Sequence, residues 1–217
     1  MHAIRQYEFG PPENLRYEAV DDPQPNVGQV RIVVRVAGVH LVDTAIRAGA
    51  AGGPFPLPDL PMTPGREVAG IVDAVGGEVD SAWAGKRVVA HLGLVSGGYA
   101  ELAVVAAASL HALPDSLPDD AAVAMIGTGR TTMGILEAAQ LRPDDVVLAT
   151  AAAGGIGNLL VQEARQVGAT VVGVAGGPAK VAQVRQLGAT AAVDYTAPEW
   201  PKQVLEALDG GDVTVVL

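Results

Sequence analysis

The chain has 217 residues, 49% of them hydrophobic and 18% charged, so it can fold around a packed core and is not disordered. Its 14 Lys and Arg against 24 Asp and Glu give a net charge of −10, which argues against a surface that binds nucleic-acid phosphates or anionic membranes. It has no cysteine, which excludes disulfides, thiolate metal sites and a cysteine nucleophile and fits a cytoplasmic location.

The chain begins without the apolar run of a secretory signal, and nowhere does it approach the ~18–20 consecutive apolar residues of a membrane helix.

The first half of the chain is predicted to form a small irregular β-barrel. The prolines of residues 52–65 predict an extended surface loop, and Gly70 predicts a bulge or a close backbone approach within its strand. The expected strands are residues 29–36, 67–75, 86–91 and 99–105.

The second half alternates short apolar strands with helices, a pattern typical of a buried parallel sheet. Turn-forming residues at 114–120 favour a division into two domains, 1–118 and 119–217. The expected strands are residues 145–150, 170–175, 190–195 and 212–217. The expected helices run from the glycine-rich turn to residue 167, over 179–187 and over 198–208.

One short sequence occurs twice in this half, as RQVGAT at 165–170 and RQLGAT at 185–190. Gly168 and Gly188 are each predicted to end a helix in the left-handed conformation, with a strand directly afterwards. Two copies are too few for a solenoid, so they are interpreted as consecutive helix-to-strand turns of one sheet.

The glycine-rich turn, Ala152-Ala153-Gly154-Gly155-Ile156-Gly157, fits the G-x-G-x-x-G pattern with Ala in the first place. It follows a buried strand and opens a helix, the context that a dinucleotide site requires. Gly154 and Gly155 let a diphosphate approach the backbone, the helix directs free N–H groups at it, and Gly157 lets the helix pack closely. The alternative is a tight turn without a ligand.

The residues after the second strand favour NADPH over NADH. An NAD site usually has an acid about 20 residues after the turn, to hold the ribose hydroxyl groups. No Asp or Glu occurs between Glu163 and Asp194, whereas Lys180 and Arg185 can attract a 2′-phosphate. The alternative is that both cations belong to an exposed helix face.

These motifs, together with four further segments, resemble the medium-chain dehydrogenase/reductase superfamily, and within it the zinc-free quinone oxidoreductases, the zeta-crystallin-like proteins. The resemblance extends over nearly the whole chain. Its segments are residues 37–49 (AGVHLVDTAIRAG), 64–72 (PGREVAGIV), 97–101 (GGYAE), 151–157 (AAAGGIG) and 191–195 (AAVDY).

The resemblance implies an α/β protein in which a GroES-like barrel is followed by a Rossmann domain, with the substrate in the cleft between them. It implies that Gly176, Lys180 and Tyr195 surround the 2′-phosphate and that Thr131 lies near the nicotinamide. Together with the turn residues 153–157, these are the expected cofactor-binding residues. For Tyr195, an ordinary aromatic at a strand end is the alternative.

The resemblance also predicts that no catalytic metal is bound. Zinc-dependent relatives hold their metal with Cys, His and Cys, and the corresponding positions here are His40, Arg66 and Thr128. Arg cannot ligate a cation and Thr is a poor zinc ligand. His91 and His111 are interpreted as ordinary structural or surface histidines.

Three residues depart from this branch and leave the substrate open. His40 stands where Asn is common, Ala45 where Tyr often lines the pocket, and Arg130 where an apolar residue is usual. His40 is the one candidate catalytic residue, as a proton donor near the reacting centre, with water as the alternative.

The predicted sheet contains four of the six strands of a complete dinucleotide fold. A fourth strand, left as an apolar edge at residues 213–217, would expose unpaired backbone groups. We therefore expect either that the chain belongs to a longer reading frame or that it pairs through this edge, for example in a homo-oligomer.

The leading functional hypothesis is an NADPH-dependent, zinc-independent oxidoreductase that passes a hydride to a quinone or an α,β-unsaturated carbonyl. One alternative is a dinucleotide-binding or interaction module without turnover. Another is an enoyl-thioester reductase of the same superfamily, but the first half has no basic cluster for an acyl carrier.

Overall fold

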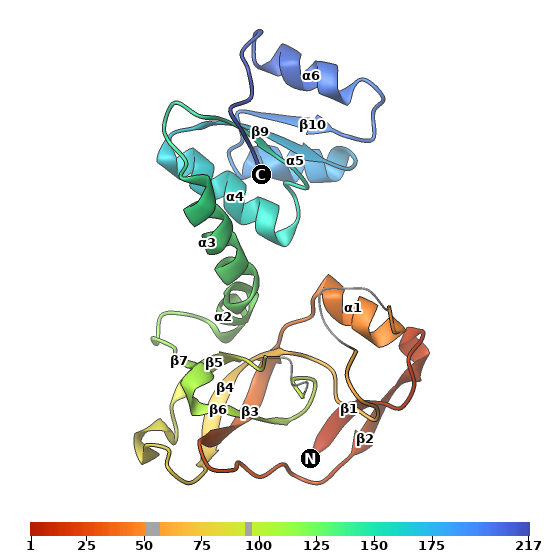
Figure 1. The fold of residues 1–217 in the computed structure, drawn as a ribbon, viewed down its shortest axis with the longest axis vertical. Coiled ribbons are helices and arrows are strands. Elements are labelled where there is room, and N and C mark those ends of the chain that lie inside the picture. Colours follow the sequence, from red (N-terminus) through yellow and green to blue (C-terminus); the bar gives the residue numbers. More distant parts are fainter. Residues whose placement is uncertain (51–56, 94–96) are drawn as a thin grey trace. The chain divides into compact units, whose positions relative to one another are not determined.

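The computed structural model describes residues 1–50, 57–93 and 97–217, and its chain divides into two compact units, Met1–Gly127 and Thr128–Leu217 (Figure 1). The domain boundary expected between residues 118 and 119 stays a prediction. In the described part of the chain, no helix is both long and apolar enough to cross a bilayer.

The first unit is built mainly of strands. Its strands are β1 (His2–Gln6), β2 (Leu15–Ala19), β3 (Gln29–Ala37), β4 (Glu67–Val75), β5 (Arg87–His91), β6 (Leu102–Ala106) and β7 (Leu110–Ala112). Its helices are α1 (Leu41–Ala48) and α2 (Asp119–Ile126), with short 3-10 turns at Pro12–Asn14, Ser81–Trp83 and Ala107–Ser109.

Five of these strands form an antiparallel sheet in the order β6-β3-β4-β5-β7, and β1 and β2 form a separate hairpin. The register of β3 on β4 shifts between Val34 and Val36, which is a bulge. Gly70 faces the bulge, and a Cβ there would lie only 2.0 Å from the carbonyl oxygen of Val33. The bulge and the close backbone approach that Gly70 predicts are therefore both present.

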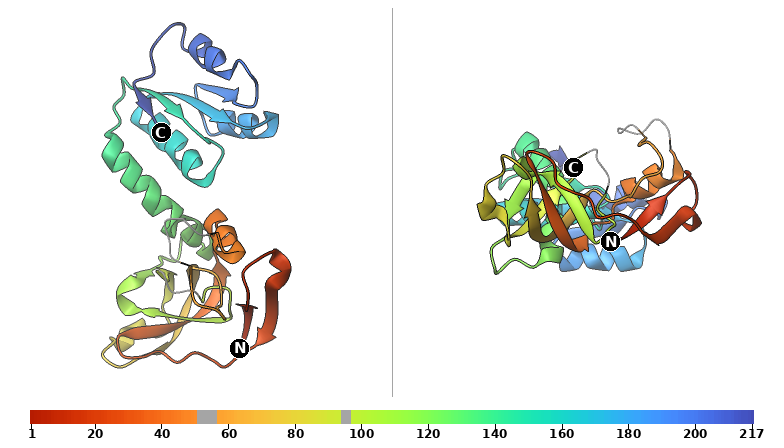
Figure 2. Two further views of the ribbon diagram at one scale, coloured as in Figure 1. Left: turned by 45° about the vertical axis from the view of Figure 1, so that its right-hand side comes forward. Right: turned by 90° about the horizontal axis from the view of Figure 1, so that it is seen from below.

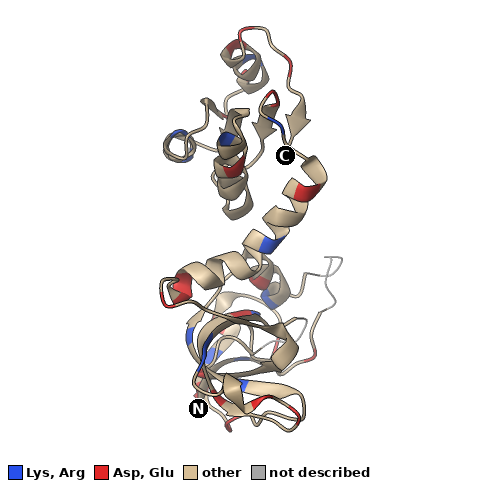
Figure 3. Cartoon of the chain, turned by 90° about the vertical axis from the view of Figure 1, so that its left-hand side faces the viewer, with Lys and Arg blue, Asp and Glu red and all other residues tan. Residues whose placement is uncertain are grey.

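Helix α2 is attached to the sheet of the first unit by packing and by an ion pair. Ala122 and Val123 of the helix pack with Ala69 and Val89 of the sheet. The guanidinium of Arg87 donates to the carboxylate of Asp119 at 2.6 Å, at the start of the helix. In the view of Figure 3, acidic and basic residues are scattered over both units.

The second unit alternates strands and helices after an initial helix (Figure 2). Its strands are β8 (Val146–Ala149), β9 (Thr170–Ala175), β10 (Ala191–Asp194) and β11 (Val215–Val216). Its helices are α3 (Thr128–Ala139), α4 (Gly155–Val167), α5 (Pro178–Gln186) and α6 (Trp200–Ala207).

The four strands are parallel, in the order β10-β9-β8-β11, with helices on both faces. One face packs against α4 and α5 through residues such as Val147, Val161 and Val184. The other face packs against α6 through Val172 and Val204. This is one half of a doubly wound sheet, as the apolar runs predict.

The repeated RQ-x-GAT sequences form the predicted turns. Gly168 and Gly188 both have φ of +96°, in the left-handed region. Gly188 also touches the first copy of the motif, because a Cβ at Gly188 would lie 2.5 Å from Cδ of Arg165. The two turns are therefore in contact.

Residues 57–65 contain no helix or strand, as the prolines predict, while the prolines at 54 and 56 lie outside the described residues. The expected strand at 99–105 begins three residues later, at Leu102, and the one at 212–217 is confined to Val215–Val216.

Candidate functional site

The glycine-rich turn leaves the carboxyl end of β8 and leads into α4. Gly154 is the N-cap of the helix, and the first helical bond runs from Asn158 N–H to the carbonyl of Gly154 at 2.8 Å. The N–H groups of Gly155, Ile156 and Gly157 precede that bond, so the helix provides them with no acceptor. Together with the helix dipole they can receive an anion.

The three glycines of the turn have different surroundings. Gly154 and Gly155 are exposed, whereas Gly157 is buried. A Cβ at Gly157 would lie 2.5 Å from the carbonyl oxygen of Ala151 and 2.7 Å from Cα of Ala152, which leaves no room for a side chain. Gly157 therefore allows the helix to pack on the strand, and the two exposed glycines leave the backbone open to solvent.

The next crossover brings Gly176 and Tyr195 together. Gly176 follows β9 and Tyr195 follows β10, and a Cβ at Gly176 would lie 2.8 Å from the Tyr195 hydroxyl. Tyr195 is 45% exposed, so its ring lies over the turn with one side open to solvent. Both residues lie at the carboxyl edge of the parallel sheet, where open α/β sheets bind ligands.

The two cations near this turn differ in their contacts. Lys180 is exposed in the first turn of α5, and among the described residues it has no hydrogen-bond or ion-pair partner. Arg185 lies in the last turn of α5 and donates to the carbonyl of Ala192 at 3.3 Å, as a structural residue would. Lys180 is therefore the better candidate for a phosphate ligand.

The sequence has no acid between Glu163 and Asp194, and this predicted no carboxylate near the end of the second strand. That prediction is wrong, because the fold brings Asp194 there. Asp194, at the end of β10, accepts the N–H of Gly177 at 2.9 Å, and it also accepts the N–H and hydroxyl of Thr196. These hydrogen bonds, the one from Gly177 foremost, lower the pKa of the Asp194 carboxyl below its ordinary value. The start of α5 therefore has a carboxylate beside it as well as Lys180.

Thr131 lies in α3, the helix that packs on α4. It is exposed, and so is Arg130, while Thr132 is buried and donates to the carbonyl of Thr128 at 2.9 Å. A Cβ at Gly155 would lie 3.2 Å from the side chain of Thr128, so the start of α3 adjoins the glycine-rich turn. The structure thus brings the helix of Thr131 to the predicted cofactor site.

In the first unit, His40 pairs with Glu67. The two side chains meet at 2.5 Å, between Nε2 of the imidazole and Oε2 of the carboxylate. His91 lies on the other side of the carboxylate, with Nε2 at 3.8 Å from Oε1. The side chain of Glu67 is only 5% exposed, whereas that of His40 is 28% exposed.

His40 is also fixed through its backbone. It is the N-cap of α1, and its N–H donates to Oδ2 of Asp43 at 2.8 Å. The Tyr99 hydroxyl donates to the same oxygen at 3.0 Å. Burial raises the pKa of Tyr99 above its ordinary value, and the neighbouring Asp43 carboxylate raises it further, so Tyr99 remains a hydrogen-bond donor.

Sequence reasoning did not predict Glu67, Asp43, Tyr99 or Asp194 as members of these clusters. Glu67 and His40 are 27 residues apart on different elements, so no short motif relates them. The conspicuous signal was Glu67 itself, a charged residue at the start of an apolar run, since an acid is almost never fully buried without a partner.

The described part of the chain does not gather metal-ligating side chains into one cluster. Across residues 1–50, 57–93 and 97–217, no group of three or more His, Asp or Glu is placed to hold a metal ion. Nδ1 of His91 accepts the N–H of Gly93 at 2.9 Å, so the neutral ring carries its proton on Nε2, which faces Glu67.

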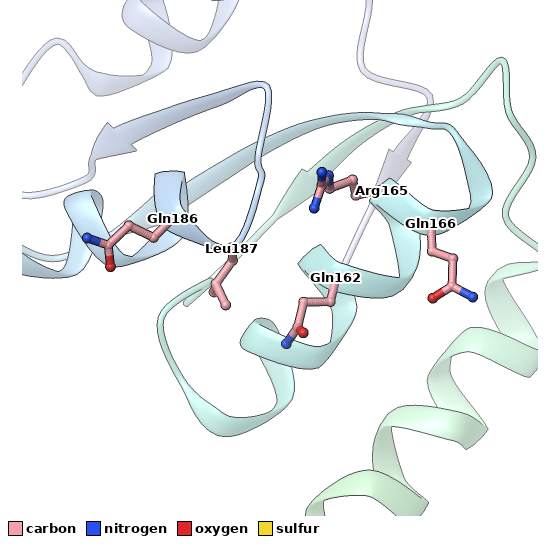
Figure 4. Close-up of a pocket in the computed structure, with 5 residues that line it drawn as sticks. All are labelled: Gln162, Arg165, Gln166, Gln186 and Leu187. Atoms are coloured by element: carbon pink, nitrogen blue, oxygen red, sulfur yellow. The ribbon is translucent and has the colours of Figure 1, made fainter.

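An open depression of about 560 Å³ lies elsewhere on the second unit (Figure 4). Its lining side chains come from α4 and the end of α5, and none of them is a predicted cofactor residue. It lies beside the turns that contain Gly168 and Gly188, away from the carboxyl ends of the strands. We therefore do not assign the dinucleotide to it. The lining residues are Gln162, Arg165, Gln166, Gln186 and Leu187.

Two family models match the chain. The alcohol dehydrogenase GroES-like domain matches residues 26–115, and the zinc-binding dehydrogenase matches residues 155–217. The chain is 36% identical over 209 residues to a quinone oxidoreductase of Pseudomonas aeruginosa, and the match covers 96% of this chain and 63% of the relative. It is 39% identical over 191 residues to the quinone oxidoreductase of Mus musculus, covering 87% of this chain and 56% of the relative.

Solved structures show the same similarity. The Escherichia coli quinone oxidoreductase complexed with NADPH superposes with a TM-score of 0.89 at 29% identity, over 100% of this chain and 65% of that one. The quinone oxidoreductase of Pseudomonas syringae gives a TM-score of 0.87 at 35% identity, over 99% of this chain and 65% of that one. The chain thus spans less than two thirds of the length of each of these relatives.

Proposed function

Because this chain belongs to the medium-chain dehydrogenase/reductase superfamily, in its quinone oxidoreductase branch, we propose that it binds NADPH and serves the transfer of a hydride to a quinone or an α,β-unsaturated carbonyl. The superfamily accounts for a GroES-like first unit and a Rossmann-like second unit. The cofactor and the substrate are the proposal.

The glycine-rich turn is the observation that supports the proposal most. Two exposed glycines, Gly154 and Gly155, lie at the carboxyl end of a parallel strand and at the start of a 13-residue helix. Without side chains there, a diphosphate can reach the N–H groups that the helix leaves unpaired. An ordinary turn would not need this combination of open backbone, strand end and helix start.

Lys180 and Tyr195 support NADPH as the dinucleotide. An exposed ammonium in the first turn of α5 can pair with a 2′-phosphate, and the hydroxyl of Tyr195, close to Gly176, can donate to the same group. The E. coli relative was solved as an NADPH complex. The Asp194 carboxylate beside Gly177 opposes a second negative charge, so Lys180 has to outweigh it.

When bound, NADPH supplies the hydride. The residues of this chain orient the cofactor through Ala153, the turn from Gly154 to Gly157, and Thr131. We propose that no zinc takes part, since Arg66 and Thr128 stand at two of the three positions that hold zinc in metal-dependent relatives. Substrate polarisation then depends on hydrogen bonds and on a proton donor, for which His40 is the candidate.

The activity, substrate and partners of the whole protein are part of this proposal, because the relatives are longer than the chain. We propose the cytoplasm as its location, which suits a chain without cysteine. A homo-oligomer, or pairing through residues 213–217, stays a prediction.

The test is NADPH binding by fluorescence together with NADPH consumption in the presence of a simple quinone and a chelator. We expect tight binding, weaker binding of NADH, and consumption that the chelator does not reduce. Binding without consumption would favour a dinucleotide-binding module without turnover. Consumption that a chelator abolishes would contradict the zinc-independent reaction.

A further inference from the structure

The end of strand β9 has beside it an acid that comes from the next strand. In sites for NAD, a carboxylate about 20 residues after the glycine-rich turn holds the ribose hydroxyl groups. No Asp or Glu occurs between Glu163 and Asp194 in the sequence. The fold nevertheless brings Asp194, at the end of β10, to hydrogen-bond distance of Gly177, the N-cap of α5. A carboxylate therefore lies at the end of β9, although that strand and its turn contain no acid.

The local turn is built on one oxygen of the Asp194 carboxylate. Oδ1 accepts the N–H of Gly177 at 2.9 Å, and it accepts the N–H and the hydroxyl of Thr196 at 2.9 and 2.7 Å. Among the residues that the structure describes, none donates a hydrogen bond to Oδ2. The second oxygen of the carboxylate is therefore available to a ligand.

The three hydrogen bonds do not by themselves require an acid. The amide oxygen of an asparagine also accepts hydrogen bonds, so an asparagine at this position could make the same three contacts. The acid adds a negative charge and a second acceptor oxygen. The hydrogen bonds lower the pKa of the Asp194 carboxyl, so this charge is present at neutral pH.

Lys180 brings the opposite charge to the same turn. Within residues 1–50, 57–93 and 97–217, neither Lys180 nor Asp194 forms an ion pair, so both charges can act on a ligand. A Cβ at Gly177 would meet nothing within 4 Å, which leaves open space between them and solvent. A 2′-phosphate is attracted by Lys180 and repelled by Asp194, whereas a ribose hydroxyl is neutral and can donate to a carboxylate.

We propose that Asp194 is a specificity-determining residue of this site, which accepts a ribose hydroxyl of NADH on Oδ2 and opposes the 2′-phosphate of NADPH, so that the chain binds both dinucleotides. This inference rests on the proposed function and extends it to a second cofactor. Lys180 favours NADPH, and Asp194 limits that preference. The ratio of the two affinities is then a balance between two oppositely charged side chains at one turn.

The first test compares NADPH and NADH by fluorescence titration of the wild type and of Asp194→Asn, without any substrate. The amide keeps the acceptor for the three hydrogen bonds and removes the charge. We expect Asp194→Asn to bind NADPH about threefold to tenfold more tightly, because one nearby charge of the same sign is lost. We expect it to bind NADH about threefold more weakly, because a neutral amide is a weaker partner for a hydroxyl than a carboxylate is.

Asp144→Asn is the matched control for charge. Asp144 is exposed just before β8, at the opposite edge of the sheet, and no described residue pairs with its side chain. The substitution removes the same charge from the second unit, so both affinities should stay within about twofold of the wild type. If Asp144→Asn raised the NADPH affinity as much as Asp194→Asn, net charge would explain the change and Asp194 would have no specific role.

Salt distinguishes the loss of a charge from a change in the shape of the turn. The gain in NADPH affinity of Asp194→Asn should shrink between about 0.05 M and about 0.5 M salt, because screening weakens the repulsion in the wild type. A gain of equal size at both concentrations would contradict the charge role. Asp194→Ser also presents an uncharged acceptor oxygen, and it serves as the second variant if Asp194→Asn does not fold.

The failures are distinguishable. A wild type that binds neither dinucleotide contradicts the proposed function. A wild type that binds NADPH but no NADH contradicts the role of Asp194 alone, and so does an unchanged ratio of the two dissociation constants in Asp194→Asn. Equal weakening of both dinucleotides, in an Asp194→Asn chain that is folded by circular dichroism, would show that Asp194 only shapes the turn and would also overturn the inference.

Discussion

The Tyr195 hydroxyl lies 2.8 Å from the position that a Cβ on Gly176 would occupy, so the smallest possible side chain at Gly176 would displace the ring. The hydroxyl is the far end of a half-exposed side chain, so the ring can swing away and the fold is kept. We expect Gly176→Ala to weaken NADPH binding by at least about fivefold, because Tyr195 leaves the 2′-phosphate. Gly134→Ala in α3, where a Cβ would meet nothing within 4 Å, is the control and should bind normally. Unchanged NADPH affinity in Gly176→Ala would remove Tyr195 from the site.

Lys180→Ala should separate the two nicotinamide cofactors. A charge-assisted hydrogen bond to a 2′-phosphate is worth ~1–3 kcal/mol, so we expect NADPH binding to weaken by about this amount and NADH binding to stay nearly the same. Lys202→Ala is the matched control, since Lys202 is an exposed lysine of α6 paired only with Glu206 at 3.7 Å. Fluorescence titration with both cofactors provides the measurement. Equal losses for NADPH and NADH would refute the role of Lys180.

An alanine at Gly157 should reduce the stability of the fold, whereas an alanine at Gly154 should reduce the affinity for NADPH. At Gly157 the Cβ would lie 2.5 Å and 2.7 Å from backbone atoms, so Gly157→Ala should destabilise the second unit by about 1–3 kcal/mol. At Gly154 the nearest atom would be 3.1 Å away, so Gly154→Ala should fold nearly as well as the wild type but bind NADPH at least about tenfold more weakly. Urea unfolding and NADPH titration distinguish the two. A Gly154→Ala chain with full affinity would show that the ligand does not approach this backbone.

Asp194 predicts a stability that depends on pH. Its pKa in the folded chain is lowered, chiefly by the hydrogen bond from Gly177 and then by Thr196. The ionised form therefore stabilises the fold at pH values above the ordinary carboxyl pKa, and this contribution is lost as the pH falls through the lowered pKa. Urea midpoints measured between pH 6 and pH 2.5 should fall less steeply for Asp194→Asn than for the wild type, whereas Asp212→Asn should follow the wild type. Identical slopes for Asp194→Asn and the wild type would contradict the prediction.

The second unit was largely predictable because local pattern and tertiary burial agree there. The runs at residues 145–150 and 170–175 are apolar because both faces of the sheet are covered, and the structure places β8 and β9 within them. The glycines of the turn and of the two RQ-x-GAT copies allow a close helix approach or a positive φ, and their positions in the sequence predicted these backbone roles. The four predicted strands are present, and their order β10-β9-β8-β11 is that of the first four strands of a dinucleotide fold.

The helices of the middle of the chain were not predicted. Helix α3 has the sequence TGRTTMGILEAA, in which two glycines and three threonines disfavour a helix by intrinsic propensity. Its packing on α4 overrides that propensity. Strands β1 and β2 also escaped prediction, because polar and charged residues interrupt their five-residue sequences and they form a hairpin apart from the five-stranded sheet.

Of the two candidate sites, the cofactor site was predictable from the sequence and the cluster around His40 was not. The residues of the cofactor site come from turns whose composition is unusual, so a linear motif can find them. The partners of His40 come from strand β4 and helix α1, and Tyr99, which bonds the Asp43 carboxylate, comes from the segment before β6, so their contact depends on the fold of the first unit. Asp194 is the sharpest case, because it follows the second strand by almost twenty residues yet bonds the turn at its end.

The RQ-x-GAT turns lie at the amino ends of β9 and β10, whereas Gly154, Gly176 and Tyr195 follow the carboxyl ends of their strands. Arg165 touches Gly188, so the amino edge is tied together by contacts that no proposed ligand residue shares. Residues at the carboxyl edge of the sheet can therefore be exchanged while the contacts at the amino edge keep the fold. Related proteins can thus differ in nucleotide preference while they share the same fold.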